Sequence, residues 1–557
     1  MNPGTGGGGE GGSLWKHGLL AFLSLGLLSC AFHPVNQPWL AWLAFVPWMV
    51  HHQRKAPPGS VRVLCAAFYL HHVYMLMWVG EVAPPMVWVI PLMGIPFTAS
   101  LAWLLDLGVH RLRLPPLWLY ALGITAFDVL RQFLLHLTWV PVGHTAWWWT
   151  DLLQTASIFG VHGMTFAVVS VNGALAAGLS AVLERRGEPG SSPLRRPLLA
   201  ASAGLLPAIL LAALGAVLLA RLELRPGPTV LGVQPNIPQE VKLRTRRIEV
   251  WKRLCRVWEE GGGADEDPDL LVLPETCFFS VSDPDRSLES LLELRDPRFP
   301  RGRLAGIFPR GRGQMTVVGY ARFRKIPPDS RIVDEDGDGF QEWNVAGVVR
   351  DGRTLVAEYA KRILVPFGEF VPLPEWWPRR EAFKEMILEQ AGYVPDLTPG
   401  DRGVFPELKL ADGRSYRFGL SICYEIVFPG VFREMAREGC DFAVNVSNDG
   451  WYHESNELDL VNIQTAFRAV ECRRSVVRVS NTGISTVVDP AGRHLDTVEV
   501  DGRRKSVAGL LRARVPICAE RTLYARFWLL PASVFILAFA LLLAWGWGRS
   551  RRPPPAK

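Results

Sequence analysis

Residues 420–426 read LSICYEI and are followed by a turn at Pro429 and Gly430. The apolar letters predict a short buried strand, and Cys423 stands at the point where this strand ends. A thiol in such a place is a candidate nucleophile, because cysteine can form a covalent acyl intermediate. The segment therefore predicts a β-containing domain that carries a cysteine nucleophile at a strand end.

Two further strand-like runs end in chemically useful side chains. Residues 271–275 read LVLPE and end in Glu275, and Lys361 precedes the run LVPFGE, which ends in Glu369. A glutamate can accept a proton, a lysine can stabilise negative charge and a thiol can attack a carbonyl carbon. A buried cysteine alone is usually only a small apolar residue. The combination of Glu275, Lys361 and Cys423 instead predicts thiol-dependent acyl transfer.

Long apolar stretches divide the 557-residue chain. Asp, Glu, Lys and Arg are absent from residues 17–53, 82–105, 152–183, 197–220 and 527–548. About 20 helical residues cross the hydrocarbon layer, so these runs, with shorter ones at 63–80 and 115–136, predict about eight membrane spans. We therefore expect a disordered N-terminus at 1–13, a membrane domain at 14–220, a catalytic domain at 221–524, a transmembrane helix at 525–548 and a basic tail at 549–557.

The basic residues predict how the chain crosses the membrane. Lys and Arg occur in loops 54–55, 111–113 and 185–196 and in the C-terminal tail, whereas loops 33–38, 81–85 and 137–152 contain neither. Basic loops stay in the cytoplasm, so both termini are expected there and residues 221–526 outside it. This topology accounts for the net charge of +7, which is therefore no sign of nucleic-acid binding.

The polar segment between the last two spans alternates between strand and helix patterns. The expected strands are 230–234, 270–273, 315–320, 346–349, 417–422, 442–446, 475–479 and 485–489, and the expected helices are 244–258, 430–438 and 456–473. Alternation of this kind is typical of a layered α/β domain. The expected fold class is a multi-pass α-helical membrane domain joined to an extracytoplasmic α/β domain.

The order Glu, Lys, Cys resembles the nitrilase (carbon-nitrogen hydrolase) superfamily. The whole chain resembles the apolipoprotein N-acyltransferase family through motifs that occur in the same order. They are DVLR at 128–131 with Trp139, VQPNIPQ at 233–239, LPE at 273–275, YAK at 359–361, LVPFGE at 364–369, ICYE at 422–425, SNDGW at 447–451 and RAVE at 468–471. One such motif would be weak evidence for the resemblance, but the ordered set of motifs together with the apolar spans is specific to this family.

The resemblance implies an α-β-β-α sandwich and a bacterial inner-membrane enzyme with a periplasmic catalytic domain. It implies transfer of a fatty acyl chain from a phospholipid to the N-terminal α-amine of a diacylated apolipoprotein, the last step of lipoprotein maturation. Cys423 would carry the chain as a thioester, with Glu275 as base and Lys361 at the oxyanion. Glu369, Tyr424 and Glu425 would support the site. We expect a monomer without cofactor, metal or nucleic acid.

The chain departs from the family pattern at four places, one of which is LTW at 137–139, where the family has Phe-Pro-Trp. Val461 stands where the family usually has a histidine, and Leu243 stands near the position of a common tryptophan. Residues 334–339 form an acidic insertion, DEDGDG. The insertion resembles the start of a calcium loop, but its twelfth position is Val345 rather than glutamate, which favours a solvated loop. These departures concern substrate detail, because the three reactive side chains are present.

Several residues have a structural and a functional interpretation. Trp139, Trp147, Trp148 and Trp149 are interfacial anchors or the entrance for a lipid chain. Asp128 and Arg131, three residues apart on a membrane helix, are expected to pair with each other.

The histidines and cysteines give weaker signals. His71, His72 and His162 show no metal-ligand spacing. The five cysteines besides Cys423 in the polar domain cannot all pair with one another, and we expect no obligatory disulfide.

Two other functions were weighed against N-acyl transfer. A membrane-tethered amidase would use the same residues with water as the acceptor. A catalytically silent lipoprotein-binding protein is disfavoured, because Glu275, Lys361 and Cys423 are all present.

Overall fold

The computed structural model describes residues 8–136, 138–185, 195–244, 246–283, 287–311, 313–326, 339–374, 376–391 and 395–551. The chain forms two compact units. The first comprises Met1–Gly80, Pro85–Arg221 and Thr522–Lys557, and the second comprises Glu81–Pro84 and Leu222–Arg521.

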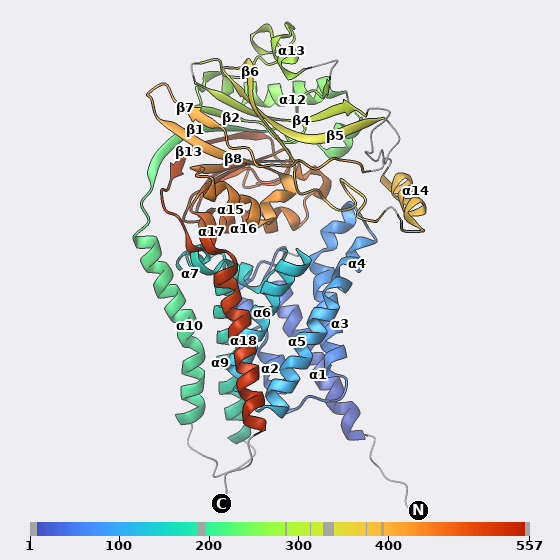
Figure 1. Ribbon diagram of the computed structural model, residues 1–557, viewed down its shortest axis with the longest axis vertical. Coiled ribbons are helices and arrows are strands. Elements are labelled where there is room, and N and C mark those ends of the chain that lie inside the picture. Colours follow the sequence, from blue (N-terminus) through green and yellow to red (C-terminus); the bar gives the residue numbers. More distant parts are fainter. Residues whose placement is uncertain are drawn as a thin grey trace, which may run out of the picture. The chain divides into compact units, whose positions relative to one another are not determined.

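The first unit is helical (Figure 1). Its longer helices are α1 (Gly8–Cys30), α2 (Val46–Arg54), α3 (Ser60–Met75), α4 (Met86–Met93), α5 (Ile95–Asp106), α6 (Pro116–Leu135), α9 (Val161–Arg185), α10 (Arg195–Ala220) and α18 (Leu529–Ser550). Helix α9 packs against α6 and α10, α18 packs against α6, and α1 packs against α3. The unit is therefore a bundle whose C-terminal helix joins the helices that precede the catalytic domain.

In the part of the chain that the structure describes, five helical segments are long and apolar enough to cross a membrane. They are Met86–Arg111, Pro116–Leu135, Val161–Leu183, Ala201–Ala220 and Leu530–Ser550. The other expected spans coincide with α1 and with the shorter helices α2 and α3. Residues 38–54 are divided between the 3-10 helix Pro38–Trp42 and α2, since prolines at 38 and 47 interrupt helical hydrogen bonding. Helix α1 begins at Gly8, inside the stretch 1–13 that was expected to be disordered, because helix propagation adds one hydrogen bond per residue.

Reporter fusions test the predicted topology. A reporter that is active only in the cytoplasm should be active when fused after Gly187 or Lys557 and inactive after Gly261. The physical reason is that the basic loops stay on the side of synthesis. A periplasm-specific reporter at the same three positions is the control and should give the reverse pattern. Activity of the cytoplasmic reporter at Gly261 would contradict the topology.

The second unit contains two β-sheets. The first has the strand order β13-β1-β2-β4-β5-β6, with β3 (Val281–Asp283) also paired to β4, and the second has the order β12-β11-β10-β9-β8-β7. The strands of the first sheet are β1 (Arg225–Gln234), β2 (Leu270–Val272), β4 (Met315–Lys325), β5 (Phe340–Arg350), β6 (Thr354–Ala360) and β13 (Gly509–Ile517). Those of the second are β7 (Glu407–Lys409), β8 (Ser415–Ile422), β9 (Phe442–Ser447), β10 (Ser475–Ser480), β11 (Thr486–Val488) and β12 (His494–Thr497).

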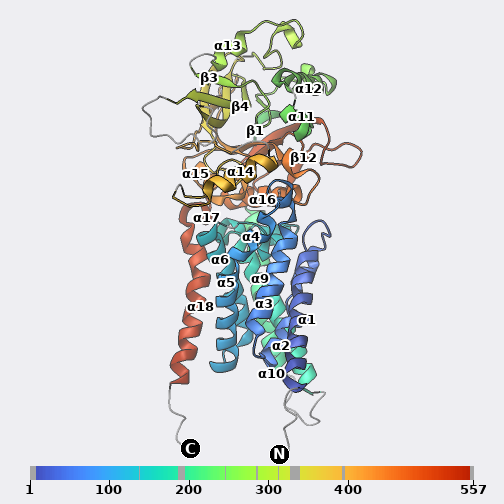
Figure 2. The ribbon, with the colours of Figure 1, turned by 90° about the vertical axis from the view of Figure 1, so that its right-hand side faces the viewer.

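The two sheets face each other across one apolar core. Val317 of β4, Leu420 of β8 and Val444 of β9 all belong to this core and are fully buried. On the outer face of the first sheet lie α12 (Arg247–Glu260) and α13 (Leu288–Glu293), and on that of the second lie α15 (Pro429–Arg437) and α16 (Glu457–Cys472) (Figures 1 and 2). The layers are therefore helix, sheet, sheet, helix, and the expected α-β-β-α sandwich is confirmed.

Most expected elements of this unit are present. Strand β4 pairs antiparallel with β5, Gly319 opposite Ala346, and β8, β9 and β10 are parallel neighbours. Parallel strands buried on both faces read as near-continuous apolar runs, which is why the sequence revealed them. The helix expected at 244–258 corresponds to α12, which begins three residues later, and a separate short helix, α11 (Gln239–Arg244), precedes it. The strands β12 and β13 and the helix α13 were not expected.

Candidate active site

Cys423 lies directly after the last residue of β8, as predicted. It begins a 3-10 turn, Cys423–Val427, and has a φ of 50°, a left-handed backbone conformation that is uncommon for residues other than glycine. Such conformations persist where surrounding contacts enforce them, often at active sites. Burial raises the pKa of the Cys423 thiol above its ordinary value, and Glu275 raises it further, while Lys361 lowers it. The resting thiol is therefore protonated at neutral pH and needs a base.

Glu275 is held in the loop after β2 by a close approach to β4. Gly319 of β4 makes this possible, since a Cβ there would lie 2.5 Å from the carbonyl oxygen of Pro274 and 2.7 Å from Cα of Glu275. The Glu275 side chain is only 5% exposed, and its Oε2 is buried without a hydrogen-bond partner. Burial raises the pKa of this carboxyl above its ordinary value. A buried carboxylate oxygen without a donor can accept a proton from a nearby thiol.

Lys361 lies between two glutamates. Its Nζ is 2.6 Å from Oε1 of Glu369 and 3.9 Å from Oε1 of Glu275. Burial lowers the pKa of the Lys361 ammonium, but Glu369, Cys423 and Glu275 together outweigh it and hold the pKa above its ordinary value. The lysine is therefore a fixed positive charge. Glu369 also accepts a hydrogen bond from the Val365 backbone N–H at 2.8 Å, which fixes the carboxylate that holds the lysine.

Glu425 joins the nucleophile turn to the segment that carries Lys361. Its buried carboxylate accepts hydrogen bonds from the backbone N–H groups of Ile422, Arg362 and Ile363 at 2.8, 2.8 and 3.1 Å. It also accepts from the Tyr359 hydroxyl at 2.7 Å. With its oxygens engaged in this way, Glu425 positions the site rather than exchanging protons.

Tyr424 contributes to the same turn. Its ring packs edge-to-face on Phe428, with ring centroids 5.0 Å apart. The aromatic pair therefore braces the segment that follows Cys423.

Two residues near Glu275 were missed by the sequence reasoning. Asn344 of β5 donates a hydrogen bond from Nδ2 to Oε1 of Glu275 at 2.5 Å. Lys242 of α11 donates from Nζ to the backbone carbonyl of Glu275 at 2.9 Å and to the Thr276 hydroxyl at 2.7 Å, and burial lowers its pKa to about 8. The available signals were a polar residue inside the apolar strand β5 and a lysine just after the motif at 233–239.

Several of these groups line one pocket of about 260 Å³. It is lined by Cys423, Glu275 and Glu369, and also by Gln239, Lys242, Asn344, Asn448, Trp451 and Tyr452. The tertiary structure thus brings together the strand-end residues selected from the sequence. A reacting carbonyl in this pocket would meet a thiol and two carboxylates, and both carboxylates pair with the Lys361 ammonium.

The contact between Asn344 and Glu275 predicts a shift in pH dependence. The hydrogen bond from Asn344 opposes the rise in the Glu275 pKa, so Asn344→Ala should raise that pKa further. The rate of Cys423 acylation falls as pH drops through the pKa of its base, and the acid limb of kcat/KM should therefore move to higher pH. Asn448→Ala is the matched control, since Asn448 bonds Gln239 and Asn481 instead. An unmoved acid limb in Asn344→Ala would exclude Glu275 as the titrating base.

The four tryptophans at 139 and 147–149 do not form one patch. Trp139 is buried and packs on Trp78, with ring centroids 4.7 Å apart, whereas Trp148 is 46% exposed and stacks on Trp149. Trp147 is half-buried. The exposed ring of Trp148 fits an anchor or an entrance, and the buried Trp139 fits a packing role.

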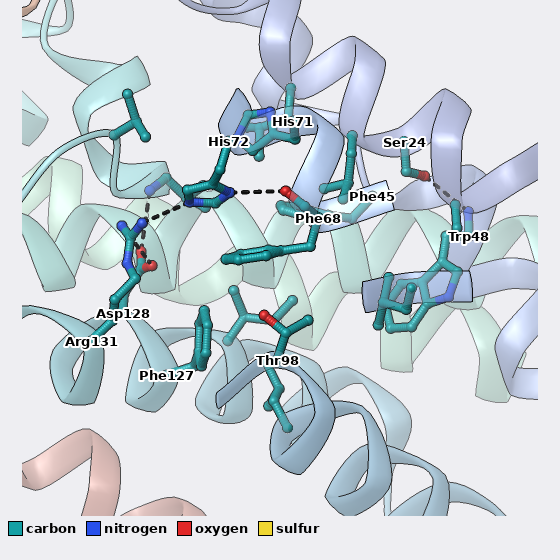
Figure 3. Close-up of a pocket in the computed structure, with 18 of the residues that line it drawn as sticks. Ser24, Phe45, Trp48, Phe68, His71, His72, Thr98, Phe127, Asp128 and Arg131 are labelled. Atoms are coloured by element: carbon teal, nitrogen blue, oxygen red, sulfur yellow. Dashed lines mark hydrogen bonds and ion pairs between the residues drawn. The ribbon is translucent and has the colours of Figure 1, made fainter. Parts of the chain in front are cut away.

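Asp128 and Arg131 pair as expected, at 3.6 Å, inside the first unit. Arg131 also bonds His72 at 2.8 Å, and Asp128 accepts from the backbone N–H of Val142 and the Thr165 hydroxyl at 3.1 Å each. Figure 3 shows this polar group at one end of an apolar pocket. The charges therefore satisfy one another within the helical bundle.

The remaining sequence features have modest roles. All eight cysteines lie in the described residues and are free. Val461 is a buried residue of α16, and Leu243 lies in α11. The acidic insertion, apart from Gly339, lies outside the described residues.

Comparisons with known proteins match both units. Residues 24–174 match the family described as the apolipoprotein N-acyltransferase N-terminal domain, and residues 245–508 match the carbon-nitrogen hydrolase family. The chain belongs to the apolipoprotein N-acyltransferase family. It is thus an N-acyltransferase of the membrane, in which a nitrilase-like unit carries the pocket around Cys423.

Relatives named apolipoprotein N-acyltransferase align along nearly the whole chain. That of Bradyrhizobium diazoefficiens is 28% identical and covers 95% of each chain, and that of Geobacter metallireducens is 27% identical and covers 85% of each. That of Rhodopseudomonas palustris is 25% identical over 97% of this chain and 96% of its own. Among solved structures, the NitN amidase from Neterenkonia sp. AN1 is 20% identical and covers 52% of this chain and 92% of its own, with a TM-score of 0.33.

Proposed function

We propose that this N-acyltransferase moves a fatty acyl chain from a membrane phospholipid to the N-terminal α-amine of the diacylglyceryl-cysteine of apolipoproteins. The observation that carries the proposal is the arrangement around Cys423. Glu275, which is buried with one unpartnered carboxylate oxygen, lines the same pocket as the strained Cys423, and the Lys361 ammonium lies 3.9 Å from Glu275. The reaction would run in two steps through a Cys423 thioester.

In the first step Glu275 takes the thiol proton while the sulfur attacks the ester carbonyl of the phospholipid. The carbonyl oxygen becomes an oxyanion, which the Lys361 ammonium stabilises together with the backbone N–H that follows Cys423. The carbon–oxygen bond then breaks, and Glu275 returns the proton to the departing alkoxide. The products are a lysophospholipid and the Cys423 thioester.

In the second step the α-amine of the acceptor attacks the thioester carbonyl. A new carbon–nitrogen bond forms, the carbon–sulfur bond breaks, and a proton passes from the amine through Glu275 to the sulfur. Glu369 holds Lys361 in place through both steps, since its oxygens bind Nζ of Lys361 and the Val365 backbone. The thioester stores the acyl chain until an amine arrives.

The proposal includes a location. Five candidate spans make the chain a membrane protein. We infer from the basic loops that it crosses the bacterial inner membrane with the catalytic unit on the periplasmic side, where mature lipoproteins are found. The exposed Trp148 fits an entrance for the acyl chain from the lipid layer.

The deciding experiment identifies the acceptor. A phospholipid with an alkyne-tagged acyl chain should label Cys423 in the full-length protein in detergent. Adding a diacylated lipopeptide with a free N-terminus should move the tag to its α-amine, whereas an N-acetylated copy of the same peptide should leave the thioester in place. Growth of a strain depleted of its own N-acyltransferase should be restored by this chain.

The runner-up is a tethered amidase, which the match to carbon-nitrogen hydrolases favours. In that case water would release the tagged fatty acid from Cys423 at the same rate with and without the lipopeptide. Fast release to water, with no tag on the peptide, would overturn N-acyl transfer in favour of hydrolysis.

A further inference from the structure

The first unit brings one potential metal ligand next to two others that lie far from it in the sequence. His52 lies in α2, Asp106 ends α5, and His110 lies in the π-helical turn Leu107–Arg111 that follows. One ligand atom from each lies within 4.8 Å of the others. No short motif could reveal this set, because 54 residues separate His52 from Asp106.

Two of the ligands are already oriented by outer partners. Nε2 of His52 is 2.6 Å from Oδ1 of Asp106, while Nδ1 of the same ring is 2.7 Å from the Tyr120 hydroxyl. The other oxygen of Asp106 accepts a hydrogen bond from the Ser60 hydroxyl at 3.0 Å. Metal-binding histidines characteristically use the second ring nitrogen in this way, which fixes the tautomer and the direction of the ring.

We propose that His52, Asp106 and His110 bind a divalent transition-metal ion, for which Zn²⁺ is the best match. Two imidazoles and one carboxylate are a donor set that zinc uses, with water at the fourth position. His110 is exposed, and its ring packs edge-to-face on that of His52 with ring centroids 5.3 Å apart. Its π-helical turn is a rare element that is often found at functional sites.

The geometry requires only a small adjustment. Donors of a tetrahedral zinc ion lie about 3.3 Å apart, so the hydrogen-bonded contact of His52 and Asp106 would open by under about 1 Å. The ion would replace the proton that lies between Nε2 of His52 and Oδ1 of Asp106. The neutral ring would then carry its proton on Nδ1 and donate it to the Tyr120 hydroxyl. Zinc would then tie α2 to the end of α5 and, through Tyr120 and Ser60, to α6 and α3. The basic loops at 54–55 and 111–113 flank the cluster, so we expect it to meet cytoplasmic ions.

Metal binding is tested on the full-length protein, purified in detergent with an affinity tag that lacks histidine. After chelation and dialysis, the protein should bind one equivalent of Co²⁺ with visible ligand-field bands of nitrogen and oxygen ligands, and Zn²⁺ should displace it. Saturating Zn²⁺ should raise the midpoint of thermal unfolding of the first unit by about 5 °C. A protein that binds no ion would overturn the proposal.

Three variants locate the ion. His110→Gln changes an exposed side chain and should weaken binding by over about 100-fold, and Tyr120→Phe, which removes only an outer partner, should weaken it by about 10- to 100-fold. His51→Gln is the matched control, because His51 is adjacent on α2 but pairs with His17 at 3.2 Å. It should bind as the unmodified protein does. If His110→Gln bound the ion as tightly as the unmodified protein, the ion would lie elsewhere and the assignment would be overturned. A thiolate band in the Co²⁺ spectrum that disappears in Cys423→Ser would overturn it as well.

Discussion

Cys423→Ser is expected to abolish acyl transfer while the protein still inserts into the membrane. The serine hydroxyl is far less acidic than the thiol, so the carboxylate of Glu275, which lines the same pocket, should deprotonate it poorly. We expect turnover to fall by roughly 10³-fold or more, in line with the loss of other enzymatic nucleophiles. The measurement is N-acylation of a lipopeptide by the purified variant, together with mass spectrometry of the intact protein for the missing thioester.

The control for Cys423→Ser is a cysteine of similar burial outside the pocket. Cys440→Ser changes a buried thiol that lies just before β9 and does not line the site. Its rate should stay within a few-fold of the unmodified enzyme. Near-normal N-acylation by Cys423→Ser would show that the acyl chain is not carried on this sulfur.

Glu275→Gln is expected to prevent the thioester from forming at all. Glutamine keeps the shape and the hydrogen bond with Asn344 but cannot accept the thiol proton, and general bases contribute about 10²–10⁴-fold. Burial, the main cause of the raised Cys423 pKa, remains in this variant and keeps the thiol protonated, so the thiolate is not supplied readily without a base. The measurement is the rate of Cys423 labelling by an alkyne-tagged phospholipid in a single turnover.

Glu369→Gln should behave differently, because Glu369 acts through Lys361. The variant should still form the thioester, but its lysine is held less firmly, and transfer to the lipopeptide should slow more than acylation does. Accumulated thioester in Glu369→Gln, with none in Glu275→Gln, is the expected pair of results. Normal labelling of Glu275→Gln would remove it as the base and leave Glu369, since the oxygens of Glu425 are engaged by four donors.

The large-scale organisation could be predicted because it depends on local pattern. Apolar runs of about 20 residues indicate membrane helices, since the bilayer leaves backbone groups no other partner. Continuous apolar runs such as 442–446 indicate strands buried on both faces, and β9 lies there. Cys423 and Glu275 could be selected because each follows an apolar run, and Lys361 because it precedes the run LVPFGE.

The edge strand β12 and the strand β13 were not predicted, because their mixed polar and apolar residues show no clear periodicity of hydrophobicity. Strand β12 has no fully buried residue, and exposed and buried positions are mixed along β13.

By itself, the sequence determined the two-part organisation of this protein, its α/β class and the identities of its three candidate reactive groups. The pairing of distant segments was decided only in the tertiary structure. Sheet register places Asn344 against Glu275, and the turn after Cys423 brings Glu425 to the backbone beside Lys361. Helix packing likewise joins His52 to Asp106. Such contacts depend on how whole helices and strands pack, and the local sequence pattern around a residue does not indicate which distant residue it will contact.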